Sequence, residues 1–108
     1  MNRGEVWWVS FDPSLGGEIR KTRPAVIVSN NTANAVLNRV VVVPLSSQVA
    51  KLYPAEARVW LNGEERKAMA DQIMTASKQR LQSRMGALSR SDLAAVEDAI
   101  LLHMGIRR

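Results

Sequence analysis

The order of apolar and polar residues divides the chain into short extended segments followed by one helical segment. The extended segments are rich in β-branched and aromatic residues or alternate between apolar and polar ones, and turn-forming residues separate them. This pattern predicts strands at 5–11, 24–29, 39–45, 57–61 and 66–70. Shorter extended pieces are expected at 71–75 and 80–81, a charged loop at 14–22, and a polar connection with one helical turn at 30–34.

Two local signals refine the predicted strands. Asn62-Gly63 is a strong signal for a tight hairpin between the fourth and fifth segments. Pro44 lies near the end of the most apolar segment, and because proline cannot donate a ladder hydrogen bond, we expect this strand to lose its pairing there. Three residues with hydrogen-bonding side chains follow beside the freed strand end: Ser46, Ser47 and Gln48.

The end of the chain has the spacing of an amphipathic helix. The segment from Ser89 to Asp92 resembles a capping box with Asp in place of Glu, and Gly105 stands where the helix is expected to stop. Between them, apolar residues recur on one helical face: Leu93, Val96, Ile100 and Met104. The chain is therefore expected to be mainly β with a C-terminal helix: a small, strongly bent antiparallel barrel or sheet on which the helix packs. We expect one domain spanning residues 1–108.

Composition restricts the partners and the compartment. Fifteen Lys and Arg residues against ten Asp and Glu give a net charge of +5, which favours a polyanionic partner such as nucleic acid or an acidic protein tail. The absence of Cys excludes disulfides and thiolate chemistry and suits a reducing cytosol. No apolar run is long enough to span a bilayer, and the N-terminus has no apolar signal core. We therefore expect a cytoplasmic protein without membrane attachment.

The available side chains exclude several kinds of catalysis. The single histidine, His103, falls in the last turn of the predicted helix, where interaction with the helix dipole explains it better than a role as general base. No spacing typical of metal ligands, no phosphate-binding loop and no nucleophile elbow is present, so we expect neither a metal nor a cofactor. Most aromatic residues alternate within predicted strands and are expected in the core. Any catalysis must use arginine, hydroxyls, amides and carboxylates.

The segment from Lys21 to Ser29 contains the strongest candidate group, Arg23. Pro24 biases the preceding residue toward extended backbone, so Arg23 is expected to be held at the start of a strand. A guanidinium held in this way can bind a phosphate or a carboxylate. Metal-free cleavage of RNA needs only such a group and a hydroxyl, because the 2′-OH of RNA is an internal nucleophile. The alternative is a surface ion pair between Arg23 and a carboxylate such as Glu18.

The chain resembles the MazF/PemK toxins of bacterial toxin–antitoxin modules. The resemblance rests on blocks that match in order along essentially the whole length: Arg3 to Trp7, Phe11 to Pro13, Gly17-Glu18, Arg23 to Asn30, Val43 to Gln48, Ala70 to Ile73 and Leu88-Ser89. It implies an SH3-like barrel with a C-terminal helix, assembled as a homodimer. It also implies a sequence-specific, metal-independent endoribonuclease that cleaves single-stranded mRNA to 2′,3′-cyclic phosphate and 5′-OH ends, and arrests growth. A cognate antitoxin with an acidic, initially disordered tail would inhibit it.

The same resemblance implies roles for individual residues. The catalytic arginine of the family falls on Arg23, and its catalytic hydroxyl, usually Thr, falls on Ser46. Ser keeps the hydroxyl but lacks the methyl group that restricts χ1, so activity could be lowered without being lost. The substrate-binding candidates are Glu18, Lys21, Ser47, Gln48, Asp71 and Gln72. For Ser46 a strand-end cap is the alternative, for Glu18 a solvated loop charge, and for Asp71 a turn former.

Two other functions stay open at the level of sequence. A protein-binding poison similar to CcdB would act on gyrase through its C-terminal helix, and the ending of this chain is compatible with that. A degenerate relative would bind antitoxin or RNA without cleaving it. The positive residues between Lys78 and Arg90 are expected to form a solvated face.

Overall fold

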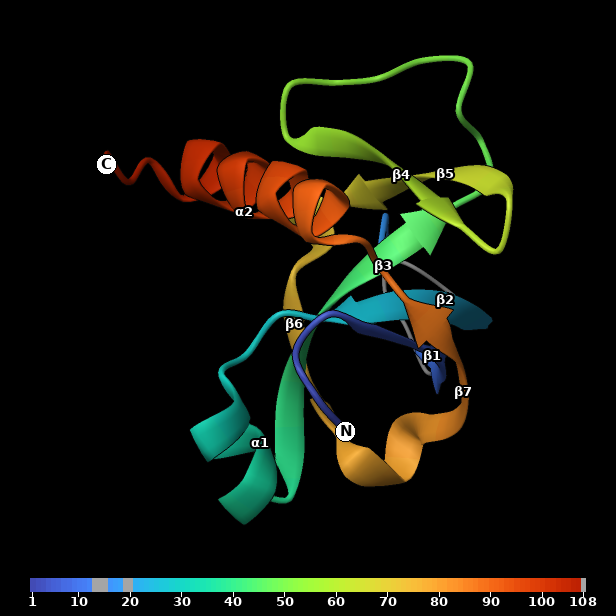
Figure 1. Ribbon diagram of the computed structural model, residues 1–108. Coiled ribbons are helices and arrows are strands. Elements are labelled where there is room, and N and C mark those ends of the chain that lie inside the picture. The colour runs from blue at the N-terminus through green and yellow to red at the C-terminus, as the bar shows by residue number, and fades with distance from the viewer. Residues whose placement is uncertain (13–15, 19–20, 108) are drawn as a thin grey trace.

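Strands contain more residues than helices do, and the longer helix stands at the C-terminal end (Figure 1). The computed structural model describes residues 1–12, 16–18 and 21–107. The predicted loop at 14–22 therefore lies partly outside the described residues, and Pro13 lies outside them. The elements are β1 (Glu5–Ser10), β2 (Thr22–Ile27), α1 (Asn31–Val36), β3 (Arg39–Ser46), β4 (Glu56–Leu61), β5 (Glu64–Met69), η1 (Ala70–Gln72), β6 (Met74–Ser77), η2 (Lys78–Arg80), β7 (Leu81–Ala87) and α2 (Arg90–Met104).

The strands form one antiparallel sheet that bends around its longest strand. The hydrogen-bonded order is β4-β5-β3-β2-β1-β7, and β6 also pairs with β3. One edge of β3 pairs with β2, while its other edge pairs first with β6 and then with β5. Because β3 changes partner along one edge, the sheet folds into the bent antiparallel arrangement that the sequence predicted.

The expectation that β3 loses its pairing near Pro44 is wrong. The strand continues through Leu45 and Ser46, which pair with Ala68 and Lys67 of β5. Val41 accepts a hydrogen bond from the Val28 N–H on the β2 side, so strand alternation turns the proline nitrogen toward the other edge. On that edge, the Pro44 nitrogen lies between the part of β3 that pairs with β6 and the part that pairs with β5, where no ladder hydrogen bond is needed. Proline is compatible with this central strand because it occupies a change of partner.

Two apolar clusters hold the sheet in place. The first contains Val26 and Val43 with residues of β4, β5 and α2, including Val59 and Val96. The second contains Val9, Ala25, Ile27 and Val42, which lie on the other face of the same strands, with Ala76 and Leu81. Because both faces of β2 and β3 are buried, the ends of these two strands are held rigidly, which is what a site requires.

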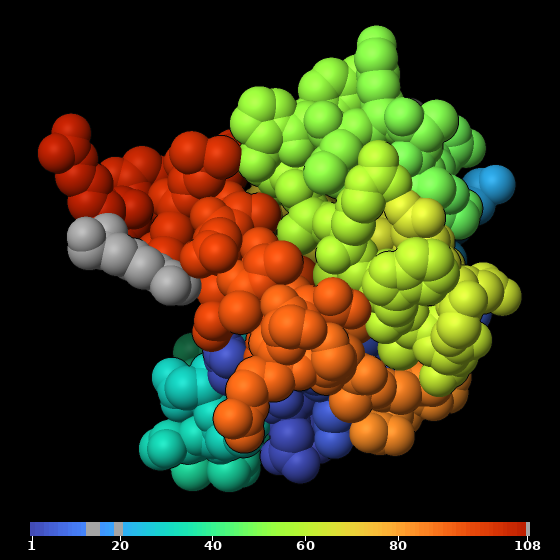
Figure 2. Space-filling model, turned by 45° about the horizontal axis from the view of Figure 1, so that its top comes forward, coloured from blue at the N-terminus to red at the C-terminus, as the bar shows by residue number. Residues whose placement is uncertain are grey.

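The terminal helix is confirmed, with two corrections. Ser89 caps it by accepting the Asp92 N–H, and Gly105 ends it with φ 70°. The capping box is only half formed, because the Asp92 carboxylate accepts the Trp60 N–H of β4 at 2.9 Å instead. Met104 does not lie on the buried face and is 56% exposed. In Figure 2, α2 lies directly against the green segments that contain β4, so this bond ties the helix to the sheet.

Other expectations differ in detail. The hairpin is confirmed, with φ 52° at Asn62 and 80° at Gly63, but the extended piece expected at 71–75 begins as the 3-10 turn η1. The long strand β7 was predicted only as a fragment at 80–81. Among the aromatic residues, Phe11 is buried, whereas Tyr53 and Trp60 are exposed and do not belong to the core. Within the described chain, no helix is long and apolar enough to cross a membrane.

Candidate active site

The backbone before β2 is closed by three contacts. The Lys21 N–H donates to Asp12 Oδ1 at 3.0 Å, and the Lys21 carbonyl accepts the Phe11 N–H at 2.9 Å. Lys21 itself has φ 64°, a left-handed conformation that is uncommon for a residue with a Cβ. Arg80 adds hydrogen bonds from Nη1 to the carbonyls of Ser10 and Asp12, at 3.0 and 2.7 Å. These contacts fix where β2 starts and hence the position of Arg23.

Arg23 and Ser46 lie beyond the same end of the β2–β3 ladder. The last pair of this ladder is Ala25 with Pro44, and Arg23 and Ser46 each stand two residues further along their strands. Because alternate residues of a strand face the same side, Arg23 faces the side of Ala25 and Ser46 faces the side of Val42, and Ala25 and Val42 both belong to the second apolar cluster. Arg23 is partly buried and pairs with Val9 of β1, whereas Ser46 pairs with Lys67 of β5. The guanidinium and the hydroxyl therefore come from neighbouring strands, on the same side of the sheet.

The hydroxyl of Ser46 is buried and already has a partner. Ser46 is 7% exposed, and its Oγ accepts the Gln48 N–H at 3.1 Å. This is the strand-end cap that the sequence offered as an alternative. Because the hydroxyl accepts in this bond, its own proton is still available for donation. Ser47 and Gln48 are exposed beside it.

A second group of predicted residues meets at η1. Gln72 Nε2 donates to the Gly17 carbonyl at 3.4 Å, next to exposed Glu18. In the sheet, β3 separates β2 from β6, and η1 packs against β3. The hydrogen bond therefore places the 16–18 segment next to η1, which itself contacts β3, the strand that ends at Ser46. Asp71 is exposed in the same turn.

Sequence reasoning missed the residues that support this arrangement. Arg80 and Lys78 were assigned to a solvated face, yet Arg80 binds backbone carbonyls around β1, and Lys78 Nζ binds the Asn34 carbonyl. That assignment is wrong for both residues. Lys67, in the wholly polar start of β5, is buried as an ion pair with Glu56. The sequence does not distinguish these three residues from lysines and arginines on the surface. Their partners are backbone carbonyls or a glutamate distant in the sequence, which no local pattern reveals.

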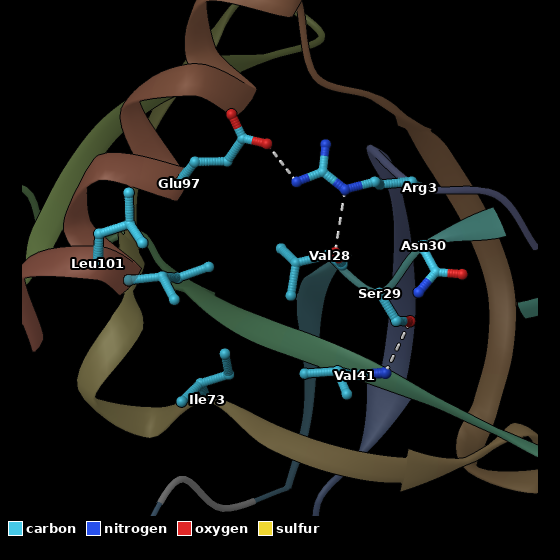
Figure 3. A pocket seen from close by; sticks show the side chains of 9 residues that line it. Arg3, Val28, Ser29, Asn30, Val41, Ile73, Glu97 and Leu101 are labelled. Atoms are coloured by element: carbon cyan, nitrogen blue, oxygen red, sulfur yellow. Dashed lines mark hydrogen bonds and ion pairs between the residues drawn. The ribbon is translucent and has the colours of Figure 1, made fainter. Parts of the chain in front are cut away.

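A cavity lies elsewhere in the described part of the protein. It has a volume of about 570 Å³ and is lined by residues that include Arg3, Val28, Ile73, Glu97 and Leu101 (Figure 3). Arg3 forms an ion pair with Glu97 there and donates from Nε to the Val28 carbonyl at 3.0 Å. None of the predicted site residues lines this cavity. The predicted site residues therefore lie outside this cavity.

One carboxylate near the N-terminus has a perturbed pKa. Burial by itself raises the pKa of Glu5, but the hydrogen bond from the Trp7 indole and the nearby N-terminus and Arg84 outweigh it, so the pKa lies below its ordinary value of 4.5. Glu5 links β1 to β7 and does not belong to the predicted site. Among the described residues, no group of three or more His, Cys, Asp or Glu is arranged to hold a metal ion.

Comparison with known proteins identifies the class to which this fold belongs. Residues 2–104 match the model of a family described as the PemK-like, MazF-like toxin of type II toxin–antitoxin systems. The endoribonuclease MazF9 of Mycobacterium tuberculosis is 37% identical over 115 residues, covering 98% of each chain. The chain therefore belongs to the PemK-like, MazF-like toxin family.

Solved structures agree with this fold. A mycobacterial endoribonuclease in complex with its cognate antitoxin superposes with a TM-score of 0.84 at 22% identity, covering 100% of this chain and 98% of that one. MazF from Deinococcus radiodurans gives 0.85 at 25% identity, with 98% and 97% covered. The expected mainly-β fold with a C-terminal helix, shared with MazF toxins, is confirmed.

Proposed function

We propose that this protein is the toxin of a type II toxin–antitoxin system and acts as a sequence-specific, metal-independent endoribonuclease on single-stranded mRNA. The family membership and the endoribonuclease relative support this class of activity. The observation that carries the proposal is the position of Arg23 and Ser46 on neighbouring strands, each two residues beyond Ala25–Pro44, the last pair of the β2–β3 ladder. The proposal treats residues 1–108 as a single toxin domain acting in the cytoplasm.

The proposed reaction uses the nucleophile that RNA supplies. The 2′-oxygen forms a bond to phosphorus as the bond from phosphorus to the 5′-oxygen breaks. The 2′-OH loses its proton and the 5′-oxygen gains one, leaving a 2′,3′-cyclic phosphate and a 5′-OH. Arg23 would donate hydrogen bonds to the phosphoryl oxygens, whose charge grows in the transition state. Ser46 would donate its free hydroxyl proton to the phosphate or orient the 2′-OH.

Residues around this pair would hold the RNA strand. We assign phosphate contacts to Lys21 and contacts to bases or phosphates to the exposed pair Ser47 and Gln48. Acceptors and donors that recognise base edges would come from Glu18, Asp71 and Gln72. Single-stranded RNA leaves its base edges open to such contacts. The bond between Gln72 and the Gly17 carbonyl supports grouping the last three residues.

Two protein partners complete the proposal. A cognate antitoxin would bind this basic protein, with a net charge of +5, through an acidic tail that is disordered before binding. A second copy of the chain would form a homodimer. Apolar side chains at the end of α2, which projects beyond the sheet in Figure 1, support an apolar contact there: Leu102, Met104 and Ile106 are 61%, 56% and 55% exposed.

Light scattering tests the assembly. A mass of two chains is expected, and Leu102→Glu should shift it toward one chain because it places a charge in the apolar contact. Leu52→Glu is the matched control, since Leu52 is an exposed leucine in the segment between β3 and β4. A monomeric wild-type protein, or equal behaviour of the two variants, would contradict this interface.

Substitution of Arg23 tests the proposed reaction. Arg23→Ala should lower the cleavage rate by at least about a hundredfold, the effect of losing one transition-state donor in other enzymes. Arg39→Ala is the control, because Arg39 is exposed at the far end of β3 and contacts Asn38. Single-turnover cleavage of a labelled RNA gives both rates. Equal rates would remove Arg23 from the mechanism.

A further inference from the structure

The segment between β3 and β4 starts at the candidate site but has little structure of its own. Residues 47–55 contain neither helix nor strand and cross above β4 as the long green loop in Figure 1. Most of them are exposed, so apolar burial does not hold the segment down. Its first residues, Ser47 and Gln48, stand next to the Ser46 hydroxyl. Something else must fix its position if that hydroxyl is to be presented accurately.

Lys67 makes three contacts, two with this segment and one with Glu56 at the start of β4. Its side chain is 9% exposed, and Nζ donates to the Lys51 carbonyl and to Glu56 Oε1, each at 3.0 Å. Nζ also lies 5.5 Å from the centre of the Tyr53 ring, within reach of a cation–π contact. Two of the three N–H donors of the ammonium are used by a carbonyl and a carboxylate, and its charge also faces the Tyr53 ring. Lys67 therefore binds the segment.

The position of Lys67 couples these contacts to the candidate hydroxyl. Lys67 pairs directly with Ser46 across β3 and β5. The far end of the segment is closed separately, because Tyr53 N donates to Glu56 Oε1 at 2.9 Å and Glu56 N donates to the Tyr53 carbonyl at 3.0 Å. Lys67 reaches beyond this turn to Lys51, closer to Gln48. The backbone from Ser46 to Lys51 is thus bracketed between the strand pairing and the Lys67 ammonium.

Stability alone does not account for this ion pair. Burying a lysine and a glutamate costs desolvation free energy that is about as large as their mutual attraction. A protein with an apolar pair of similar size in their place is often equally stable. A neighbouring pair on the same two strands, Arg58 and Glu65, is exposed and binds no part of the 47–55 segment in the contacts described. Lys67 differs from Arg58 because it is buried and because it contacts the Lys51 carbonyl, the Glu56 carboxylate and the Tyr53 ring.

We propose that Lys67 is a positioning residue of the candidate site: it ties the 47–55 segment to β5 and thereby fixes the backbone of Ser46, Ser47 and Gln48. The proposal rests on the proposed function, since Ser46 belongs to that site. It predicts that Lys67 affects the rate of the chemical step through Ser46 and makes no phosphate contact of its own.

The variant Lys67→Met/Glu56→Gln tests this proposal. It removes both charges, keeps an oxygen at position 56 for the Tyr53 N–H, and should leave the melting temperature near that of the wild type. The cleavage rate constant should fall at least about tenfold, because small misplacements of catalytic groups are costly. The salt dependence of the KM should not change, because Lys67 itself contacts no phosphate. Hydrogen exchange of the Gln48 amide, which is bonded to Ser46 Oγ, should accelerate.

Arg58→Met/Glu65→Gln is the matched control and should change neither the rate nor the exchange. An unchanged rate in the Lys67 double variant would overturn the proposal. So would a raised KM with a salt slope reduced by about one, which would make Lys67 a phosphate ligand. If the double variant loses stability, Lys67→Met/Glu56→Met replaces it with the same expected outcomes. If the wild-type protein cleaves no RNA, the proposed function fails, while the Gln48 exchange still decides the role of Lys67.

Discussion

At the scale of single residues, the candidate site depends on side chains that are fixed by their neighbours. Arg23 follows a loop closed by Asp12, Lys21 and Arg80, and the Ser46 hydroxyl accepts the Gln48 N–H. Each functional group therefore enters the reaction with its backbone already in place. This reduces the entropy that must be lost when the RNA phosphate is aligned.

Substitutions of Ser46 separate catalysis from capping. Ser46→Ala should lower the cleavage rate by about tenfold to a hundredfold, because it removes both the free O–H and the acceptor for Gln48. Ser46→Thr should retain activity, since the hydroxyl is kept. Single-turnover cleavage measures both, with Ser83→Ala on exposed β7 as the control. Equal rates for wild type and both Ser46 variants would reduce Ser46 to a cap.

At the scale of elements, strands and turns position the site more than the helices do. The β4–β5 hairpin presents Lys67 to Ser46, and its turn requires two residues with positive φ. Asn62 tolerates this conformation, and Gly63 at 80° suits it best. The helix α2 contributes indirectly by holding β4 through Asp92.

A glycine substitution tests the hairpin. Gly63→Ala should lower the free energy of unfolding by about 1–2 kcal/mol, because a Cβ is strained at this φ even though the space around it is open. Gly17→Ala is the control, since Gly17 has an unstrained φ and open space and should change stability by less than about 0.5 kcal/mol. Urea unfolding measures both. A Gly63→Ala variant as stable as wild type would contradict the turn assignment.

Much of this element structure followed from pattern, and the exceptions have physical causes. The strand from Glu5, the Asn62-Gly63 hairpin and the Ser89 cap are local signals, and all are confirmed. The strand β7 contains Gln, Ser, Arg and Gly, so its sequence does not have the pattern of a strand. It is extended because it pairs with β1. Arg23 could be proposed from its proline and the family blocks. Lys67 could not, because only the register between β3 and β5 brings it to Ser46.

At the scale of the whole molecule, the two apolar clusters lie on opposite faces of β2 and β3 and support different elements. The first cluster anchors α2, beside the cavity that contains Arg3 and Glu97. The second lies under the strand ends that hold Arg23 and Ser46. The proposed dimer contact is at the end of α2, and the proposed RNA site is on β2 and β3. The net charge of +5 would speed encounter with RNA at either copy.

Cleavage of single-stranded RNA in excess EDTA, with the product ends identified, tests the central claim most directly. A protein that works with Arg23, Ser46 and the 2′-OH of its substrate should cleave without a divalent metal and leave 5′-OH and 2′,3′-cyclic phosphate ends. DNA of the same sequence should stay intact, because it lacks the nucleophile. Cleavage that requires a metal, products with 5′-phosphate ends, or no cleavage at all would contradict the account.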